Sequence, residues 1–385
     1  MKKKKKKMLV IPQVSCKSIE GKVLFMNDSG IVFLKNMFKE MANEFDIHYA
    51  FAFDVLNSDV QYYYMLQSFL ACKMIHFDYY HSYTNAKLER LNFNVDFYKK
   101  LSEKYNFDYI FVAEPTHVVN IKALFPNAFI ITYNSWLAFK NMKEIHLRQF
   151  EGMCAADLTL VNSKYTVDEI KEYYHKNDEL KNMNIKVMNP AHYVENVKNI
   201  KKYDGNELGI IYNHRLSTDV YYSKAFENLC KVLQIVEDKI GYENMPKVYL
   251  TNPSEKSINV DLKEYMVVVD LNDQRAYHEF LESNKVLIHL NTFFESEGMW
   301  SMSTIESAIT GNICLLPKKF GYAEMFSSTY PGYCDDVVDM AERLVTILSN
   351  KYLYFENDEK LKYYTGSNVA KHLLYLIKVS EEKTK

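Results

Sequence analysis

The chain has 385 residues, 48% of them hydrophobic, which is enough for two domains of ordinary size with separate cores. Its formal net charge of −2 at pH 7 excludes the global basic field that marks many nucleic-acid binders. No apolar run approaches the ~20 residues that a membrane helix needs, and the apolar run at residues 8–14 is too short for a signal-peptide core. We therefore expect a cytoplasmic protein, in the host cytoplasm if a phage encodes it.

Residue usage adds three expectations. The six cysteines form no C-x-x-C pair and no Cys/His cluster with zinc spacing, which indicates reduced thiols. Abundant Asn, Lys, Ile and Tyr, with only 11 Gly and 8 Pro, suggest an A/T-rich genome such as that of many phages and low-GC bacteria. The basic run at residues 2–7 is interpreted as a solvated tail, with attraction to nucleic acid or anionic lipid as the alternative.

The first half of the chain alternates strand and helix patterns. A polar loop, Asn27 to Gly30, leads into a helix that Asp28 or Ser29 would cap. Further helices are expected at residues 62–70, 95–105 and 166–174. A continuous apolar run, which is typical of a buried parallel strand, occurs at residues 8–14, and further strands are expected at 46–53, 109–115, 128–134 and 157–163. Residues 186–193 close this half of the chain. This alternation predicts a parallel sheet with helices on both faces.

A polar stretch at residues 195–207 is the expected linker to a second series of the same kind. Strands are expected there at residues 208–214, 247–250, 266–269, 286–290 and 313–317, followed by an amphipathic helix from residue 368. We therefore expect an α/β chain of two doubly wound, Rossmann-like domains, residues 1–194 and 195–364. The terminal helix, about 365–385, would pack back on the first domain. In such folds, ligands bind at the carboxyl ends of the strands.

The segment EGMWSMSTIESAITGNICLLP, residues 297–317, carries the strongest functional signal. It follows an apolar strand pattern and contains Glu297 and Gly298 in a loop, then a short helix that bears Glu306. A helix N-terminus beside a glycine offers free N–H groups and a positive dipole end to an anion. Carboxylates accept hydrogen bonds from sugar hydroxyls. One element is therefore suited to hold phosphate and sugar together, as a nucleotide sugar requires.

This segment resembles the donor-binding motif of GT-B glycosyltransferases, especially the retaining family-4 type. That motif is Glu-Gly-Phe-Gly, an apolar run, Glu-Ala-Met, a small residue and Gly. Its two glutamates are eight positions apart, whereas Glu297 and Glu306 are nine apart. The extra residue leaves Glu295 as an alternative to Glu297. The unit at residues 154–170 also resembles the last unit of the family's N-domain, and the whole resemblance implies the GT-B fold, with the two domains facing across a cleft.

A second segment, residues 210–229, places Arg215 after a strand and Lys224 at the expected start of a helix. A diphosphate suits these cations, because arginine forks onto its oxygens and lysine acts as a point charge. The Asn-His-Arg form at 213–215 is similar to tRNA-queuosine mannosyltransferases. Residues 317–326 resemble that subgroup's Pro-Lys, Tyr-Pro-Glu-Ile-Phe element. Phage DNA glycosyltransferases are a further possible likeness.

The resemblance implies roles for particular residues. Glu306 would accept from the ribose hydroxyls, Glu297 would touch the donor sugar, and Arg215 would hold the diphosphate. His117 comes at the carboxyl end of an expected strand, where it would contact the acceptor or the sugar, with a hydrogen-bonded structural histidine as the alternative. Glu297, Arg215 and His117 are the predicted catalytic residues. The predicted donor-binding residues are Arg215, Lys224, Glu297, Gly298, Ser301, Glu306, Asn27 and Gly30, and the predicted acceptor-side residues are Tyr133, Asn134 and Trp136. Trp300, the other tryptophan, is core by default, with sugar or base stacking as the alternative. No metal ligand set is expected.

The sequence thus predicts a retaining glycosyltransferase that moves a sugar from a nucleotide sugar, UDP- or GDP-linked, to an acceptor. The N-terminal domain would face the acceptor and the C-terminal domain would bind the nucleotide sugar. Our first choice of acceptor is a hydroxylated base in phage DNA, with RNA as a related possibility. The alternatives are a transferase of surface glycan or lipid-linked sugar synthesis, a nucleotide-sugar epimerase, and a GT-B binding module without catalysis.

Overall fold

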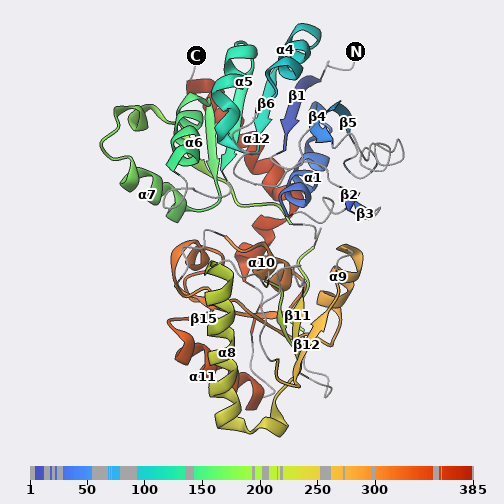
Figure 1. Ribbon diagram of the computed structural model, residues 1–385, viewed down its shortest axis with the longest axis vertical. Coiled ribbons are helices and arrows are strands. Elements are labelled where there is room, and N and C mark those ends of the chain that lie inside the picture. The colour runs from blue at the N-terminus through green and yellow to red at the C-terminus, as the bar shows by residue number, and fades with distance from the viewer. Residues whose placement is uncertain are drawn as a thin grey trace. The chain divides into compact units, whose positions relative to one another are not determined.

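In a computed structural model, the chain divides into two compact units: unit 1 is Met1–Tyr193 with Gly366–Lys385, and unit 2 is Val194–Thr365 (Figure 1). Within the described part of the chain, no helix has the length and apolar character needed to cross a membrane. The structure describes residues 5–12, 18–19, 22–23, 29–53, 68, 70, 72–78, 93–134, 143–192, 196–201, 208–214, 216, 220–251, 262–271, 274–295, 300–349, 355–356 and 358–383.

Unit 1 contains a seven-stranded parallel sheet in the order β5-β4-β1-β6-β7-β8-β9. The chain starts at the centre of this sheet, winds to one edge and then returns to the other side, which is the doubly wound pattern. The strands are β1 (Lys6–Ile11), β4 (Phe45–Phe53), β5 (Lys73–Asp78), β6 (Tyr109–Val112), β7 (Phe129–Asn134), β8 (Leu158–Val161) and β9 (Ile185–Val187), and β2 (Ser18–Ile19) pairs separately with β3 (Lys22–Val23).

Helices cover the unit 1 sheet, and α12 packs beside α1 in this unit although it comes last in the chain (Figure 1). Side chains cap α4 and α7: Asn94 accepts from Phe97 N at 3.0 Å, and Ser163 accepts from Thr166 N at 3.1 Å. The helices are α1 (Ser29–Met41), α4 (Val95–Lys104), η3 (Pro115–His117), α5 (Val118–Leu124), α6 (Lys143–Ala155), α7 (Lys164–Tyr173), η4 (Asp178–Asn182) and α12 (Gly366–Lys383).

The lysine run is in part a strand. Lys6 and Lys7 open β1. The Lys7 N–H donates to the Asp108 carboxylate oxygen Oδ2 at 2.7 Å, and the Lys7 carbonyl accepts from the Asp108 N–H at 3.0 Å. The Lys6 ammonium reaches the Tyr109 hydroxyl, which donates to Glu381 Oε1 on α12 at 2.5 Å. The solvated-tail interpretation is therefore wrong for these two lysines, because their backbone belongs to the sheet while their side chains reach solvent.

Unit 2 contains a six-stranded parallel sheet in the order β12-β11-β10-β13-β14-β15, again doubly wound from its centre. Figure 1 shows α8 and α11 side by side in this unit. The strands are β10 (Ile210–Tyr212), β11 (Val248–Thr251), β12 (Met266–Val269), β13 (Ile288–Leu290), β14 (Ile313–Pro317) and β15 (Tyr333–Cys334). The helices are α8 (Val220–Ile240), η5 (Tyr242–Asn244), α9 (Gln274–Glu282), α10 (Met302–Ile309), η6 (Phe320–Glu324), α11 (Val337–Ser349) and η7 (Glu359–Tyr364).

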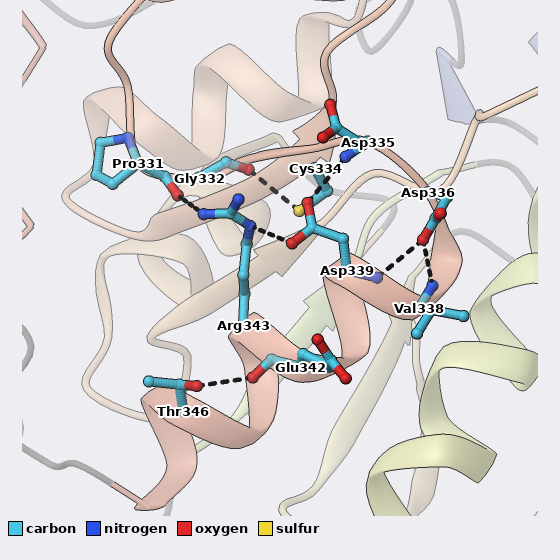
Figure 2. A network of polar contacts seen from close by, with 10 residues as sticks. All are labelled: Pro331, Gly332, Cys334, Asp335, Asp336, Val338, Asp339, Glu342, Arg343 and Thr346. Carbon is cyan, nitrogen blue, oxygen red and sulfur yellow. Dashed lines mark hydrogen bonds and ion pairs between the residues drawn. The ribbon is translucent and has the colours of Figure 1, made fainter.

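A polar network fixes the turn from the edge strand β15 into α11 (Figure 2). Asp336 Oδ1 accepts from the backbone N–H groups of Val338 and Asp339 at 2.8 and 2.9 Å, which caps the helix. Arg343, one turn further on, donates to Asp339 Oδ1 at 2.9 Å and to the carbonyl of Pro331 at 3.0 Å. The network holds the first turn of α11 against the loop that leads into β15.

The predicted strands are confirmed in both units, with small differences at their ends. β6 stops before the proline, so Pro115 opens η3 instead of ending the strand. Lys224 does not open a helix, since α8 begins at Val220. The expected helix at 62–70 lies mostly outside the described residues. Strands β5 and β15 were not predicted.

Candidate functional site

The carboxyl ends of β10 and β13 meet at the point where the unit 2 sheet reverses its winding. After β10 the chain builds β11 and β12 on one side, and it then crosses to β13 on the other. Doubly wound sheets bind ligands at this topological switch point. Asn213 and His214 follow β10 there, and Asn291 follows β13. The polar side chains described next gather at this edge.

Glu306, on α10, is the central carboxylate of this edge. Its side chain is half-buried, and its Oε2 accepts a hydrogen bond from the Tyr277 hydroxyl at 3.0 Å. Asn213 Nδ2 in turn lies 2.6 Å from the Tyr277 oxygen. Burial raises the pKa of Glu306 to about 7, although the hydrogen bond from Tyr277 opposes that rise. The carboxyl group therefore changes its charge near neutral pH.

A buried polar network supports the first turn of α10. Ser301 caps the helix, accepting from Thr304 N at 3.2 Å. Ser303 Oγ lies 3.2 Å from His214 Nδ1, and Thr304 Oγ1 lies 3.0 Å from His289 Nε2. Burial lowers the pKa of His214 to about 3 and the pKa of His289 well below its usual range. Both imidazoles are therefore neutral at physiological pH, and an anion here would meet helix dipole and hydrogen-bond donors instead of imidazolium.

The structure pairs Lys224 with Glu295, shortly after β13. Its ammonium lies 2.5 Å from Glu295 Oε2, and 54% of the lysine side chain is exposed. Glu295 directly precedes residues 296–299, which include Glu297 and Gly298 and lie outside the described residues. An exposed pair of this kind contributes only about 0–1 kcal/mol, so an anionic ligand can replace Glu295 as the partner of Lys224 at little cost.

Two of the three predicted acceptor-side residues of unit 1 are buried. Tyr133 and Asn134, which end β7, are only 2% and 1% exposed. The Tyr133 ring lies 4.8 Å from that of Phe33, and Asn134 Nδ2 contacts Met153 Sδ at 3.5 Å. Side chains from α1 and α6 thus cover the two faces of this strand end, so direct contact of either residue with an acceptor gains no support. Sequence periodicity alone does not show such coverage.

His117, the other predicted residue of unit 1, lies in η3 and is half-buried. Burial and the nearby Arg148 lower the pKa of His117 to about 4, so the imidazole is neutral. Its Nδ1 is buried and meets no hydrogen-bond partner among the described residues. Glu114, which precedes η3, is 4% exposed and accepts from Gln149 Nε2 on α6 at 3.1 Å.

The remaining predictions divide into two groups. Gly30 lies in the first turn of α1, and the Ser301 hydroxyl serves the cap of α10, while Trp300 packs its ring at 5.3 Å from Tyr364. The roles of Gly30 and Ser301 toward a donor stay predictions. The other predicted site residues lie outside the described residues: Arg215, Glu297, Gly298, Asn27 and Trp136. Across the described ranges, no group of three His, Cys, Asp or Glu side chains is arranged to hold a metal ion.

Two residues of this region were missed in the sequence. No sequence pattern indicated a role for Tyr277, because its contact with Glu306 is tertiary and α9 itself was not predicted. Lys201 lies in the expected linker, yet its ammonium donates to the carbonyls of Leu281, Ser283 and Val286 and to Asn312 Oδ1. It thereby ties the end of α9 to the start of β13 and to the turn after α10.

Comparison with known proteins supports the fold and leaves the family open. No protein-family model matches the chain, and no curated protein sequence matches it. Among solved structures, TarM has a TM-score of 0.68 at 12% identity, over 96% of this chain and 98% of that one. The trehalose 6-phosphate synthase of Burkholderia multivorans has a TM-score of 0.61 at 10% identity, over 99% of this chain and 100% of that one.

A third neighbour is UGT89C1 of Arabidopsis thaliana in complex with UDP, with a TM-score of 0.52 at 12% identity, over 98% of this chain and 99% of that one. Identities this low show a shared fold and nothing more. Each likeness nevertheless spans nearly the whole of both chains, so both units contribute to it. The chain therefore has the fold expected from its sequence, two Rossmann-like doubly wound α/β units of the GT-B type.

Proposed function

We propose that this protein is a glycosyltransferase that takes its sugar from a nucleoside-diphosphate sugar. The observation that carries the proposal is the polar cluster of Glu306, Tyr277 and Asn213 at the switch point of unit 2, in a chain of GT-B fold. Two of its structural neighbours support a UDP-linked donor in particular. UGT89C1 and a point mutant of S. aureus TarM were both solved with UDP.

In the proposed complex, unit 2 binds the nucleotide half of the donor. The Glu306 carboxylate accepts from the ribose hydroxyls, while Arg215 and Lys224 hold the diphosphate. Lys224 exchanges its exposed partner Glu295 for a phosphate oxygen. Glu297 and Gly298 face the sugar, and His117 approaches from the acceptor side. These roles follow from the family resemblance of the motifs and from the positions of Glu306 and Lys224.

The reaction needs no protein nucleophile in this proposal. Retention follows when the acceptor hydroxyl approaches the same face of the sugar that the diphosphate leaves. The protein's contribution is then to hold acceptor against donor and to stabilise the negative charge on the departing diphosphate. Arg215, Lys224 and the N-terminus of α10 supply that stabilisation without a metal ion.

Nucleotide binding gives the first test. UDP or a UDP-sugar is expected to raise the melting temperature, since a ligand at 100 times its Kd stabilises the fold by about 2.7 kcal/mol. Differential scanning fluorimetry with UDP, GDP, ADP and their common sugars measures this, and uridine without phosphates is the matched control. No shift with any of these ligands at millimolar concentration would refute a nucleotide-sugar donor.

For the acceptor we consider two classes, a hydroxylated DNA base and a glycan or polyol. A hydroxylated DNA base is favoured by the resemblance of residues 213–215 and 317–326 to tRNA-queuosine mannosyltransferases. A glycan or polyol is favoured by the likeness to TarM, a mutant of which was solved with alpha-GlcNAc-glycerol.

We expect transfer to hydroxymethylated DNA, measured as a hexose- or pentose-sized mass gain on the base after digestion to nucleosides. Unmodified DNA of the same sequence is the control, because it lacks the accepting hydroxyl. Transfer to a glycosylated polyol, with no mass gain on DNA, would assign the enzyme to glycan synthesis instead.

A further inference from the structure

Tyr277 connects three elements of the donor edge through a single hydroxyl. It stands on α9, receives a hydrogen bond from Asn213 at the end of β10, and donates one to Glu306 on α10. The contacts of Asn213 fix the direction of this chain. Its Nδ2 also faces the carbonyl of Ser303 at 3.4 Å, and a carbonyl can only accept. The Asn213 NH₂ group, and not its oxygen Oδ1, must therefore point toward Tyr277.

The direction of the Tyr277 hydroxyl follows from this. Because Asn213 donates to it, its own hydrogen is left for Glu306 Oε2, so that oxygen acts as an acceptor. Glu306 Oε1 makes no hydrogen bond with the residues that the structure describes, and it is not fully buried. One carboxylate oxygen is thus held in place, and the other remains available to a ligand with hydroxyl groups.

We propose that Tyr277 is a positioning residue for the ribose of the donor: held by Asn213, it orients Glu306 so that the free oxygen meets the ribose 2′,3′-diol. This inference rests on the proposed function and deepens it, since it makes the diol of the nucleotide a recognised group. Tyr277 acts through Glu306 and makes no contact with the reacting atoms.

Glu306 is the group in this cluster that titrates near neutral pH. The elements around Glu306 carry further titratable groups, among them His214 after β10, His289 on β13, Cys314 on β14 and Tyr364 on η7. The same elements also carry Tyr277, His278 and the exposed Arg275, Glu279 and Glu282 on α9, and Glu359, Lys360, Lys362 and Tyr363 on η7. Burial lowers the pKa of His214 to about 3 and of His289 well below its usual range, and it raises the pKa of Cys314 and Tyr364. With a pKa of about 7, Glu306 gains a proton as the pH falls through 7, and its capacity to accept from a diol then declines.

The experiment compares UDP with 2′,3′-dideoxy-UDP by calorimetric titration from pH 5.5 to 8.5. Both ligands carry the same diphosphate, so the ratio of their Kd values measures the contribution of the ribose diol to binding. In the wild type we expect UDP to bind more tightly at pH 8, with a preference that falls as the pH drops through about 7. Tyr277→Phe should reduce the preference about five- to tenfold and move its midpoint up by about half to one pH unit, because a hydrogen bond that favours the carboxylate is lost.

Tyr249→Phe is the matched control. Tyr249 packs with Tyr277 against the same core cluster, and its hydroxyl makes no hydrogen bond with a described residue, so this variant should keep the wild-type ratio. Should Tyr277→Phe not fold, Asn213→Asp serves instead. Its carboxylate would draw the Tyr277 hydrogen away from Glu306, and the preference should fall in the same way.

The outcomes separate the inference from the proposed function. Equal affinity of the wild type for the two ligands, or a wild-type ratio and midpoint in Tyr277→Phe, would overturn the role of Tyr277 while leaving a nucleotide-dependent enzyme in place. Failure of both ligands to bind the wild type would overturn the proposed function and, with it, this inference.

Discussion

Replacing Arg215 with alanine is expected to lower kcat for sugar transfer about 10²- to 10³-fold, or about 2.7–4 kcal/mol of transition-state stabilisation. In the sequence, Arg215 directly follows Asn213 and His214, which lie after β10 at the carboxyl edge where Glu306 lies. A cation at this position acts on negative charge that grows as the diphosphate departs, so its loss affects the transition state more than the bound donor. Initial rates at saturating donor, together with the Kd for UDP, measure the two effects separately.

Arg275→Ala is the control for that variant. Arg275 lies on α9 in the same unit, its side chain is 87% exposed, and it pairs with Glu279 one turn along the helix. Removing Arg275 changes the net charge of the unit by the same amount as removing Arg215. We expect kcat to fall far less in Arg275→Ala than in Arg215→Ala. Similar rate losses in both variants would show a general charge effect, and undiminished turnover in Arg215→Ala would place the diphosphate elsewhere.

The sheet strands could be predicted because buried parallel strands are continuous apolar runs. The expected strand at 313–317 coincides with β14, all five residues of which are buried. β5 and β15 lack that signal: β5 is an edge strand with the mixed sequence KMIHFD, and β15 has two residues. Edge strands bury less side chain and are defined by backbone pairing, which composition does not reveal.

A charge pattern gave a wrong prediction at Lys6 and Lys7, which suggested a solvated tail because isolated lysines favour solvent. Lys201, in the expected linker, likewise gave no sign of the contacts that it makes. In the fold, the first two contribute backbone to β1, and Lys201 places its ammonium among carbonyl groups. The local sequence indicates whether a side chain prefers solvent. It does not show which backbone acceptors distant segments place beside that side chain in the fold.

The candidate site shows the same limit. Glu306 was predicted because its motif is local, a strand, a loop and a short helix. Tyr277 on α9 bonds to Glu306, and Asn213 after β10 bonds to Tyr277. This chain of hydrogen bonds depends on how α9, α10 and β10 pack. Tyr133 and Asn134 were expected to be accessible at a strand end, but α1 and α6 cover them.

The second large effect is expected in unit 1, where Gly152 of α6 faces η3. A Cβ at Gly152 would lie 1.8 Å from the carbonyl oxygen of Pro115 and 2.7 Å from its carbon. Glycine to alanine within a helix ordinarily stabilises it by about 1 kcal/mol. The overlap here involves backbone on both sides, so α6 and η3 must separate, and overpacking of this kind costs about 1–3 kcal/mol or more. The cost of the steric overlap with Pro115 therefore exceeds the gain in helix propensity, and Gly152→Ala should be destabilising.

The separation should also impair sugar transfer. η3 carries His117, and the hydrogen bond from Gln149 to the buried Glu114 joins the same two elements at 3.1 Å. Stretching that hydrogen bond leaves the buried Glu114 carboxylate without a close donor to offset its desolvation, which lowers stability by about a further 1–3 kcal/mol. We expect urea unfolding of Gly152→Ala to show a net loss of about 2–4 kcal/mol, with a lower rate of transfer at temperatures where the variant is folded.

Glu151→Ala tests whether that loss belongs to the site or to the helix. Glu151 is the exposed neighbour of Gly152 on α6, and a surface substitution of this kind changes stability by only about 0.5 kcal/mol. A Gly152→Ala protein as stable as Glu151→Ala would mean that α6 and η3 separate freely. The close approach of α6 would then have no part in holding Glu114 and His117, because two elements that part without cost cannot fix the side chains between them.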